Sequence, residues 1–139
     1  MGKKPKAIVF DSWAIIAYLE DEAAADKVAN IIVDAHEDNT PLFMTVINAA
    51  EVWCIVAREV SVSDADNSVK QIRDLGIQLV EVDWQLAKAA GYFKSRNKMS
   101  FADCFAAALA KQHRASLITG DPEFKQIEQE ITLHWLPGK

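Results

Sequence analysis

Cysteine is scarce in this chain, zinc-ligand spacings are absent, and no apolar run is long. Two of the 139 residues are cysteine, and both Cys54 and Cys104 lie in apolar segments of helical character. We expect both to be reduced packing residues, which is typical of a cytoplasmic protein. No group of cysteines and histidines has the spacing of a zinc site. No apolar run approaches the ~20 residues that span a bilayer, so we expect no membrane association.

The chain also lacks internal repeats, low-complexity tracts and any linker that would divide it. Its length, with 50% apolar and 25% charged residues, predicts one globular domain over residues 1–139. The formal net charge of −5 argues against a general nucleic-acid coat protein. It is compatible with a nuclease, because an acidic metal site can lie beside a local basic patch. The densest basic stretch outside the N-terminus is either such a patch or a solvated linker between helices, and it contains Lys88, Lys94, Arg96 and Lys98.

Short apolar segments alternate with helical patterns along the chain. The segments that we interpret as strands are residues 7–10, 42–44, 77–82, 116–119 and 133–136. Helices are predicted between and around them, at residues 13–19, 23–36, 46–57, 64–75, 83–93, 100–113 and 124–129. Ser12, Thr45 and Ser100 are the candidate N-caps. This alternation predicts an α/β fold, a three-layer α/β/α sandwich whose mainly parallel central sheet is covered on both faces.

Four acids interrupt or directly follow apolar segments that contain no lysine or arginine, and they are Asp11, Glu51, Asp103 and Asp121. A carboxylate in apolar surroundings must be paired, hydrogen-bonded or metal-bound, or its pKa rises until it is neutral. Asp11 and Asp121 follow predicted strands, and ligands gather at the carboxyl ends of parallel strands. Glu51 and Asp103 lie early in predicted helices. One pocket could therefore collect all four, and carboxylate oxygens suit Mg²⁺ or Mn²⁺.

Each acid by itself also has an ordinary structural explanation. Asp103 lies in the first turn of a predicted helix, where the helix dipole favours negative charge. Asp121 can be a turn residue, and Glu51 can lie at the edge of a helix. These explanations are weaker for the four together, because Asp11 and Glu51 have none of comparable strength.

In chain order the acids stand in short motifs. Asp11-Ser12 follows an apolar strand, Glu51 lies on an apolar helix, and an alanine-rich helix begins at Ser100-Phe101-Ala102-Asp103. That helix leads into a strand and then Thr119-Gly120-Asp121-Pro122-Glu123-Phe124. The set resembles the PIN-domain ribonucleases, and specifically the VapC-type toxins of prokaryotic toxin–antitoxin pairs, over nearly the whole chain. None of the four acids departs from the pattern, so the resemblance does not indicate a degenerate, inactive member.

The resemblance implies a role for each matching residue. Asp11, Glu51 and Asp103 are implied to be the core acidic ligands of Mg²⁺ or Mn²⁺, and Asp121 the fourth acid, holding a second ion or a metal-bound water. Thr119 matches a hydroxyl position that orients a carboxylate. Ser12 either does the same or caps a helix, and we favour the cap. Asn48 either forms a hydrogen bond at the rim of the site or is a satisfied amide at the edge of the core.

The function implied is metal-dependent hydrolysis of RNA phosphodiester bonds, endonucleolytic, leaving a 5′-phosphate and a 3′-hydroxyl. In this family such an enzyme is a toxin that inhibits translation and growth, forms a homodimer, and is blocked by a small antitoxin protein. We predict that Lys94, Arg96 and Lys98 contact the RNA backbone, since phosphate neutralisation supplies much of nucleic-acid affinity. The three histidines are assigned no role.

Four alternatives stay open at this point. A housekeeping nuclease of the same fold would act on precursor ribosomal RNA or on DNA flaps. A non-catalytic scaffold of this fold would only bind RNA or a partner. A signalling receiver domain would need a lysine after a late strand, where this chain has Ile118-Thr119-Gly120. A haloacid dehalogenase-like phosphatase would need an aspartate two residues after Asp11, where Trp13 stands.

Overall fold

The computed structural model describes residues 4–138, so residues 1–3 and 139 of the predicted single domain lie outside the described residues. Five strands form one sheet in the order β3-β2-β1-β4-β5, and every pairing is parallel. The strands are β1 (Ile8–Phe10), β2 (Leu42–Thr45), β3 (Ile77–Val80), β4 (Ser116–Thr119) and β5 (Thr132–Trp135). The predicted mainly parallel sheet is therefore confirmed, and it has no antiparallel strand.

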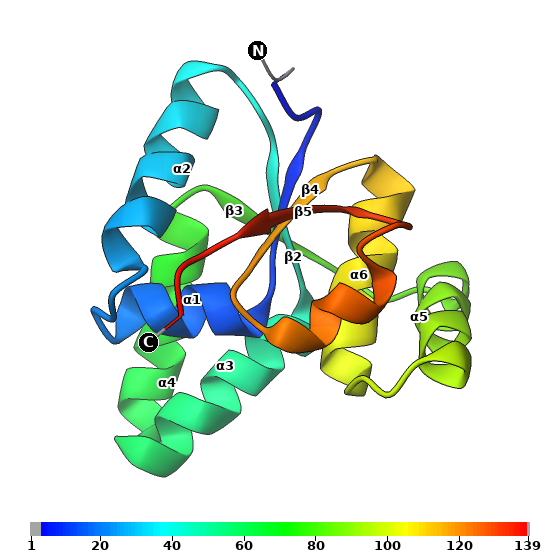
Figure 1. Cartoon of the computed structure of the whole chain (residues 1–139). Coiled ribbons are helices and arrows are strands. Elements are labelled where there is room, and N and C mark those ends of the chain that lie inside the picture. The colour runs from blue at the N-terminus through cyan, green and yellow to red at the C-terminus, as the bar shows by residue number, and fades with distance from the viewer. Residues whose placement is uncertain (1–3, 139) are drawn as a thin grey trace.

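Helices cover both faces of the sheet, as Figure 1 shows. They are α1 (Ser12–Leu19), α2 (Ala25–Glu37), α3 (Val46–Glu59), α4 (Val62–Asp74), α5 (Trp84–Arg96), α6 (Phe101–His113) and the 3₁₀ helix η1 (Pro122–Ile127). Helices α1 to α4 pack with Ile8, Phe10 and Ile118 on one face. Helices α5, α6 and η1 pack with Val9 and Leu117 on the other. Alternate residues of β1, β2 and β4 thus enter different cores, which produces the predicted three layers.

Side-chain caps begin most of the helices at the carboxyl ends of the strands. Thr45 and Ser100 cap α3 and α6 as predicted, each accepting from a backbone N–H three residues later. The prediction for Ser12 is wrong, because Asp11 caps α1 by accepting from the N–H of Ala14 at 2.8 Å. The Ser12 hydroxyl instead contacts Asn48 on α3. The residue that caps α1 is therefore Asp11, one of the four acids.

Two further expectations are corrected by packing. Cys104 is buried in the core beneath α6, but Cys54 is exposed, because α3 turns that side of an all-round apolar helix to solvent. Most of the basic stretch is not a linker, since Lys88, Lys94 and Arg96 lie on α5 and only Lys98 lies in the four-residue connection to α6. Within residues 4–138, no helix combines the length and the apolar character that crossing a bilayer requires.

Candidate metal centre

A pocket of about 250 Å³ opens where the carboxyl ends of β1 and β4 meet the N-terminal ends of α1, α3, α6 and η1 (Figure 1). Three of the four predicted acids line it, namely Glu51, Asp103 and Asp121. The rest of its wall consists of Ser12, Trp13, Ile16, Glu22, Ile55, Ser100 and Glu123. The position agrees with the tendency of parallel sheets to bind ligands at their strand ends.

Asp11 is fully buried behind this pocket. One carboxylate oxygen accepts from the N–H of Ala14 and the other from the hydroxyl of Thr119. Burial raises the pKa of the Asp11 carboxyl to about 7, the charges of Asp121 and Glu51 act in the same direction, and the two hydrogen bonds oppose them. Asp11 thus combines a structural cap with a carboxylate that nearby negative charge pushes toward protonation.

Asp103, Asp121 and Glu123 form the tightest group of acids, because one ligand atom from each lies within 4.8 Å of the others. Burial raises the pKa of Asp103 to about 9, and hydrogen bonds with Glu123 and Asp121 and repulsion from Asp121 and Asp11 add to the rise. No ion pair among residues 4–138 joins these three acids to lysine or arginine. Carboxylates gathered without a cationic side chain are a donor set that fits a hard divalent cation.

Glu123 is a site residue that the sequence interpretation missed. Asp121 caps η1 by accepting from the N–H of Glu123 at 2.9 Å, so the turn sets the two carboxyl groups side by side. The available signal was the Asp-Pro-Glu sequence, in which proline at the first helical position allows a cap and an acid two residues later to share one turn. Glu51 and Asp11 lie outside the three-acid group, although Glu51 lines the same pocket.

Asn48 joins three of the elements that carry the acids. Its amide nitrogen donates to the Ser12 hydroxyl on α1 at 3.2 Å and to the carbonyl of Ala102 on α6 at 3.1 Å. Its amide oxygen accepts from the Thr45 hydroxyl at 2.5 Å. Asn48 is fully buried, so it is not at the rim of the site; it is a satisfied amide that holds helix N-termini together.

Thr119 and Gly120 shape the turn that carries Asp121. The Thr119 hydroxyl donates to Asp11 and accepts from the N–H of Asp121 at 3.0 Å, so one side chain links two acids. A Cβ on Gly120 would lie 2.3 Å from the ring of Trp13, which forms part of the pocket wall. Only glycine therefore lets the turn approach α1 this closely.

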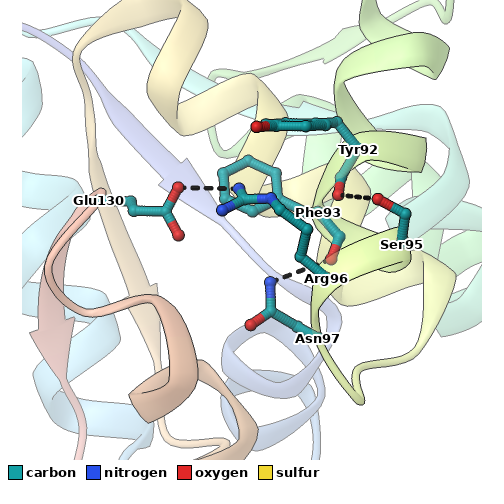
Figure 2. Close-up of polar contacts among 6 residues, drawn as sticks. All are labelled: Tyr92, Phe93, Ser95, Arg96, Asn97 and Glu130. Carbon is teal, nitrogen blue, oxygen red and sulfur yellow. Dashed lines mark hydrogen bonds and ion pairs between the residues drawn. The ribbon is translucent and has the colours of Figure 1, made fainter.

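Of the three basic candidates, Lys94 and Arg96 lie in the last turn of α5, and Lys98 lies just beyond it. Figure 2 shows Arg96 stacked on Tyr92, with its guanidinium carbon 4.1 Å from the ring centroid, while it donates to Glu130 at 2.9 Å. Lys94 donates to the carbonyl of Met99 at 2.6 Å. The backbone N–H of Lys98 donates to Gln126. None of the three lines the acidic pocket, although Met99 directly precedes its lining residue Ser100.

Comparisons with known proteins place this site in a family context. A family model described as the PIN domain matches residues 8–130. A sequence comparison with curated proteins gave no match. Among solved structures, the chain is similar to one in VapBC2 of Rickettsia felis bound to a promoter DNA fragment, with a TM-score of 0.76 and 13% identity over 94% of this chain and 99% of that one.

Two other solved structures are similar in the same way. One is Mycobacterium tuberculosis VapC20, a toxin that cleaves the sarcin–ricin loop, with a TM-score of 0.67 and 16% identity over 86% of this chain and 94% of that one. The other is VapBC-1 of nontypeable Haemophilus influenzae, with a TM-score of 0.69 and 18% identity over 93% and 97%. At these identities the likeness concerns the fold.

Proposed function

The chain belongs to the PIN-domain family, and from this premise we propose that it is a metal-dependent endoribonuclease and the toxin of a toxin–antitoxin pair. The observation that carries the proposal is the group Asp103, Asp121 and Glu123, which lines a pocket backed by the buried Asp11 and has no cationic partner among the described residues. Fold likeness to VapC-type proteins supports the toxin assignment.

We assign the metal ligands to the four acids recognised in the sequence, Asp11, Glu51, Asp103 and Asp121, together with Glu123. When bound, Mg²⁺ or Mn²⁺ supplies charge neutralisation at the phosphodiester and activation of water for its hydrolysis. Without the ion, the acids repel one another and Asp103 retains a proton, as its raised pKa indicates. The protein thus contributes a cluster of carboxylates, and their repulsion of one another favours binding of a divalent cation.

Three side chains hold those carboxylates in position. Thr119 fixes one oxygen of Asp11 and the N–H of Asp121. Asn48 and Ser12 tie the N-terminal ends of α1, α3 and α6 together. We propose that they act on the reaction through the ligands, since hydrogen-bond partners of ligands tune the affinity for a metal.

RNA is the substrate that we propose, with cleavage leaving a 5′-phosphate and a 3′-hydroxyl. VapC20, a structural neighbour, cleaves the sarcin–ricin loop, which supports an RNA target for this chain as well. The solved neighbours include VapBC complexes, which supports a small antitoxin as partner. A homodimer and a cytoplasmic location complete the proposal.

The test is cleavage of total cellular RNA by the purified protein with Mg²⁺, with Mn²⁺ and with EDTA, beside the variant Asp11→Asn. We expect discrete fragments that require both the ion and Asp11. The variant should still fold, because asparagine caps a helix as well as aspartate does. Asp74→Asn, on the exposed end of α4, is the matched control and should cleave normally.

The other outcomes separate the alternatives. A folded protein that binds Mn²⁺ and cleaves no RNA, but cuts DNA flaps, would be a repair nuclease of the same family. Binding of Mn²⁺ with no cleavage of any nucleic acid would indicate a non-catalytic scaffold. Failure to bind Mn²⁺ at all would refute the assignment of the acids as ligands.

A further inference from the structure

The segment from residue 84 to residue 102 carries positive charge in an otherwise acidic protein. It contains four basic residues and no acid, whereas the other 120 residues contain 11 basic and 20 acidic residues. This is the longest stretch of the chain without an acid. It comprises α5, the short connection that follows, and the start of α6. Figure 1 shows that α5 lies at one side of the molecule.

Aromatic and cationic side chains alternate on the outer face of α5. Trp84, Lys88, Tyr92 and Arg96 follow one another at intervals of four residues, so they lie along the same side of the helix over about 18 Å. Trp84 is 74% exposed and Tyr92 is 60% exposed. The apolar side chains Leu86, Ala90 and Phe93 point the other way, into the core beneath α5. The outer face therefore presents rings and charges rather than aliphatic groups.

Phe101 is a further exposed ring, at the start of α6 beside the acidic pocket. It is 54% exposed and lies between Ser100, which lines the pocket, and the segment that leads to the ligand Asp103. The ammonium group of Lys94 is 5.6 Å from the centroid of the Phe101 ring, so the end of α5 and the start of α6 touch here. Exposed rings and cations are thus present both along α5 and, through Lys94 and Phe101, at the edge of the pocket.

We propose that Trp84, Tyr92 and Phe101 form a stacking platform, flanked by Lys88, Lys94 and Lys98, that binds single-stranded RNA and leads it to the acidic pocket. The inference rests on the proposed nuclease function and identifies an unpaired strand as the form of RNA that the site takes. Bases stack on aromatic rings irrespective of sequence, and cations beside the rings neutralise the backbone phosphates.

Arg96 has a different role in this platform. Its guanidinium group covers one side of Tyr92 while it pairs with Glu130, so its charge is partly neutralised within the protein (Figure 2). The Tyr92 ring remains mostly exposed, and the contact fixes its orientation. Arg96 is therefore a positioning residue for the ring, and the lysines supply the charge for phosphate.

Charge favours RNA over a second copy of the chain as the occupant of this face. Two copies that met through this face would bring the lysines of residues 84–102 together, and no acid lies within that segment to compensate them, which is unfavourable. A polyanion with stacked bases complements both the charge and the rings. Protein interfaces are also enriched in aromatic residues and arginine but depleted in lysine, so the lysines of this face are what distinguish an RNA site from a protein interface.

The experiment measures binding of fluorescein-labelled oligouridylate to the full chain carrying Asp11→Asn, in EDTA, by anisotropy. In this background Trp84→Ala, Tyr92→Ala and Phe101→Ala should each weaken binding by about five- to a hundredfold, which is the range for loss of one stacked base. Tyr92→Phe and Phe101→Tyr should retain affinity because the ring remains. Val62→Ala, an exposed apolar residue on α4, is the control and should bind normally.

The salt dependence tests the lysines separately. Lys88→Gln and Lys94→Gln should each reduce the slope of log affinity against log salt by about 0.7, the value for one phosphate contact on a single strand. Lys70→Gln on α4 should leave the slope unchanged. A perfectly paired RNA duplex of the same length should bind more weakly than oligouridylate, because its bases are not free to stack on the rings.

Three results would overturn the platform. They are absence of oligouridylate binding by the parent, equal binding by the alanine variants, and equal binding of the duplex. Loss of a dimer in sedimentation by the alanine variants, with RNA binding unchanged, would assign this face to self-association instead. RNA binding that depends on the rings, without metal-dependent cleavage, would support the platform and refute the nuclease. Metal-dependent cleavage that the ring variants do not affect would support the nuclease and refute the platform.

Discussion

At the scale of single residues, the acids of the site differ in what surrounds them. Asp11 is buried and accepts two hydrogen bonds, and its pKa is raised to about 7. Asp103 lies against two other carboxyl groups, and its pKa is raised further, to about 9. Burial is the largest cause in both cases, and repulsion between carboxylates is the cause that a divalent cation would reverse.

Glu123→Gln tests whether the three-acid group binds metal as a unit. Removing one carboxylate takes away a ligand and a charge, so we expect affinity for Mn²⁺ to fall roughly ten- to a hundredfold, at least as much as for loss of a ligand's hydrogen-bond partner. Isothermal titration calorimetry measures the change. Glu128→Gln, just after the same 3₁₀ helix but outside the pocket, is the matched control. Equal affinities of the two variants would exclude Glu123 as a ligand.

At the scale of elements, the N-terminal ends of α1, α3 and α6 meet at the site. Ser12, Asn48 and Ala102 belong to these three helices, and their hydrogen bonds join them directly. Helix N-termini carry partial positive charge, which is favourable beside carboxylates. The sheet brings the helices to one edge, and the Asn48 amide then sets their spacing.

Asn48→Leu should therefore affect both folding and the metal site. The substitution removes the hydrogen bonds of the Asn48 amide to Ser12 and Ala102. It also leaves the buried Thr45 hydroxyl without its acceptor, which costs about 1–3 kcal/mol for an unsatisfied buried group. We expect a lower midpoint of denaturant unfolding together with weaker Mn²⁺ binding by the folded variant. Asn67→Leu, on the exposed side of α4, should change neither. A loss of stability with unaltered Mn²⁺ affinity would limit Asn48 to a structural role.

At the scale of the whole molecule, the proposed metal site should couple ion binding to stability. In the unfolded chain an aspartate has a pKa near ~3.9, whereas Asp11 and Asp103 have folded-state values of about 7 and about 9. Between these limits the folded, metal-free protein binds more protons than the unfolded chain. These two groups therefore make the protein less stable as the pH rises from about 4 to about 9.

The stabilities of wild type and Asp103→Asn, compared in EDTA, test this dependence on pH. At pH 8.5 the variant should be more stable by at least about 1.4 kcal/mol, the free energy of one pKa unit. At pH 4 the difference should largely vanish, because Asp103 is then protonated in the folded protein. Urea unfolding at the two pH values measures this. Mn²⁺ should stabilise wild type more at pH 8.5 than at pH 5. If Asp103→Asn is no more stable than wild type at pH 8.5 in EDTA, the raised pKa is contradicted.

Much of this arrangement was predictable from local patterns. The buried strands are recognisable as short apolar segments, and three of the four acids in apolar surroundings line the pocket. Other features were not predictable. Asp11 and Ser12 are adjacent and both are good caps, so only the direction of the chain after β1 selects Asp11. Cys54 was misjudged because α3 is apolar on nearly all sides, and its periodicity does not identify the buried one.

Local sequence also does not identify Glu123 as a residue of the candidate site. It stands among polar residues after a proline, where an acid ordinarily points to solvent, and only the turn capped by Asp121 brings it to Asp103. Arg96 looked like part of a linker because charges cluster around it. The helix α5 continues through Gly91 and the basic residues to Arg96, and Asn97 is its C-cap.

The sequence by itself determined the layered α/β fold and the presence of four acids in apolar surroundings. The alternation of strands with helices and the cost of burying a charge both depend on residues that are neighbours in the sequence. The tertiary structure alone decided which atoms share the site. Thr119 reaches Asp11 across 108 positions of the chain, and Asn48 reaches Ala102 across 54. Those contacts follow from the order of strands in the sheet and the packing of three helix ends, and no local pattern specifies such distances.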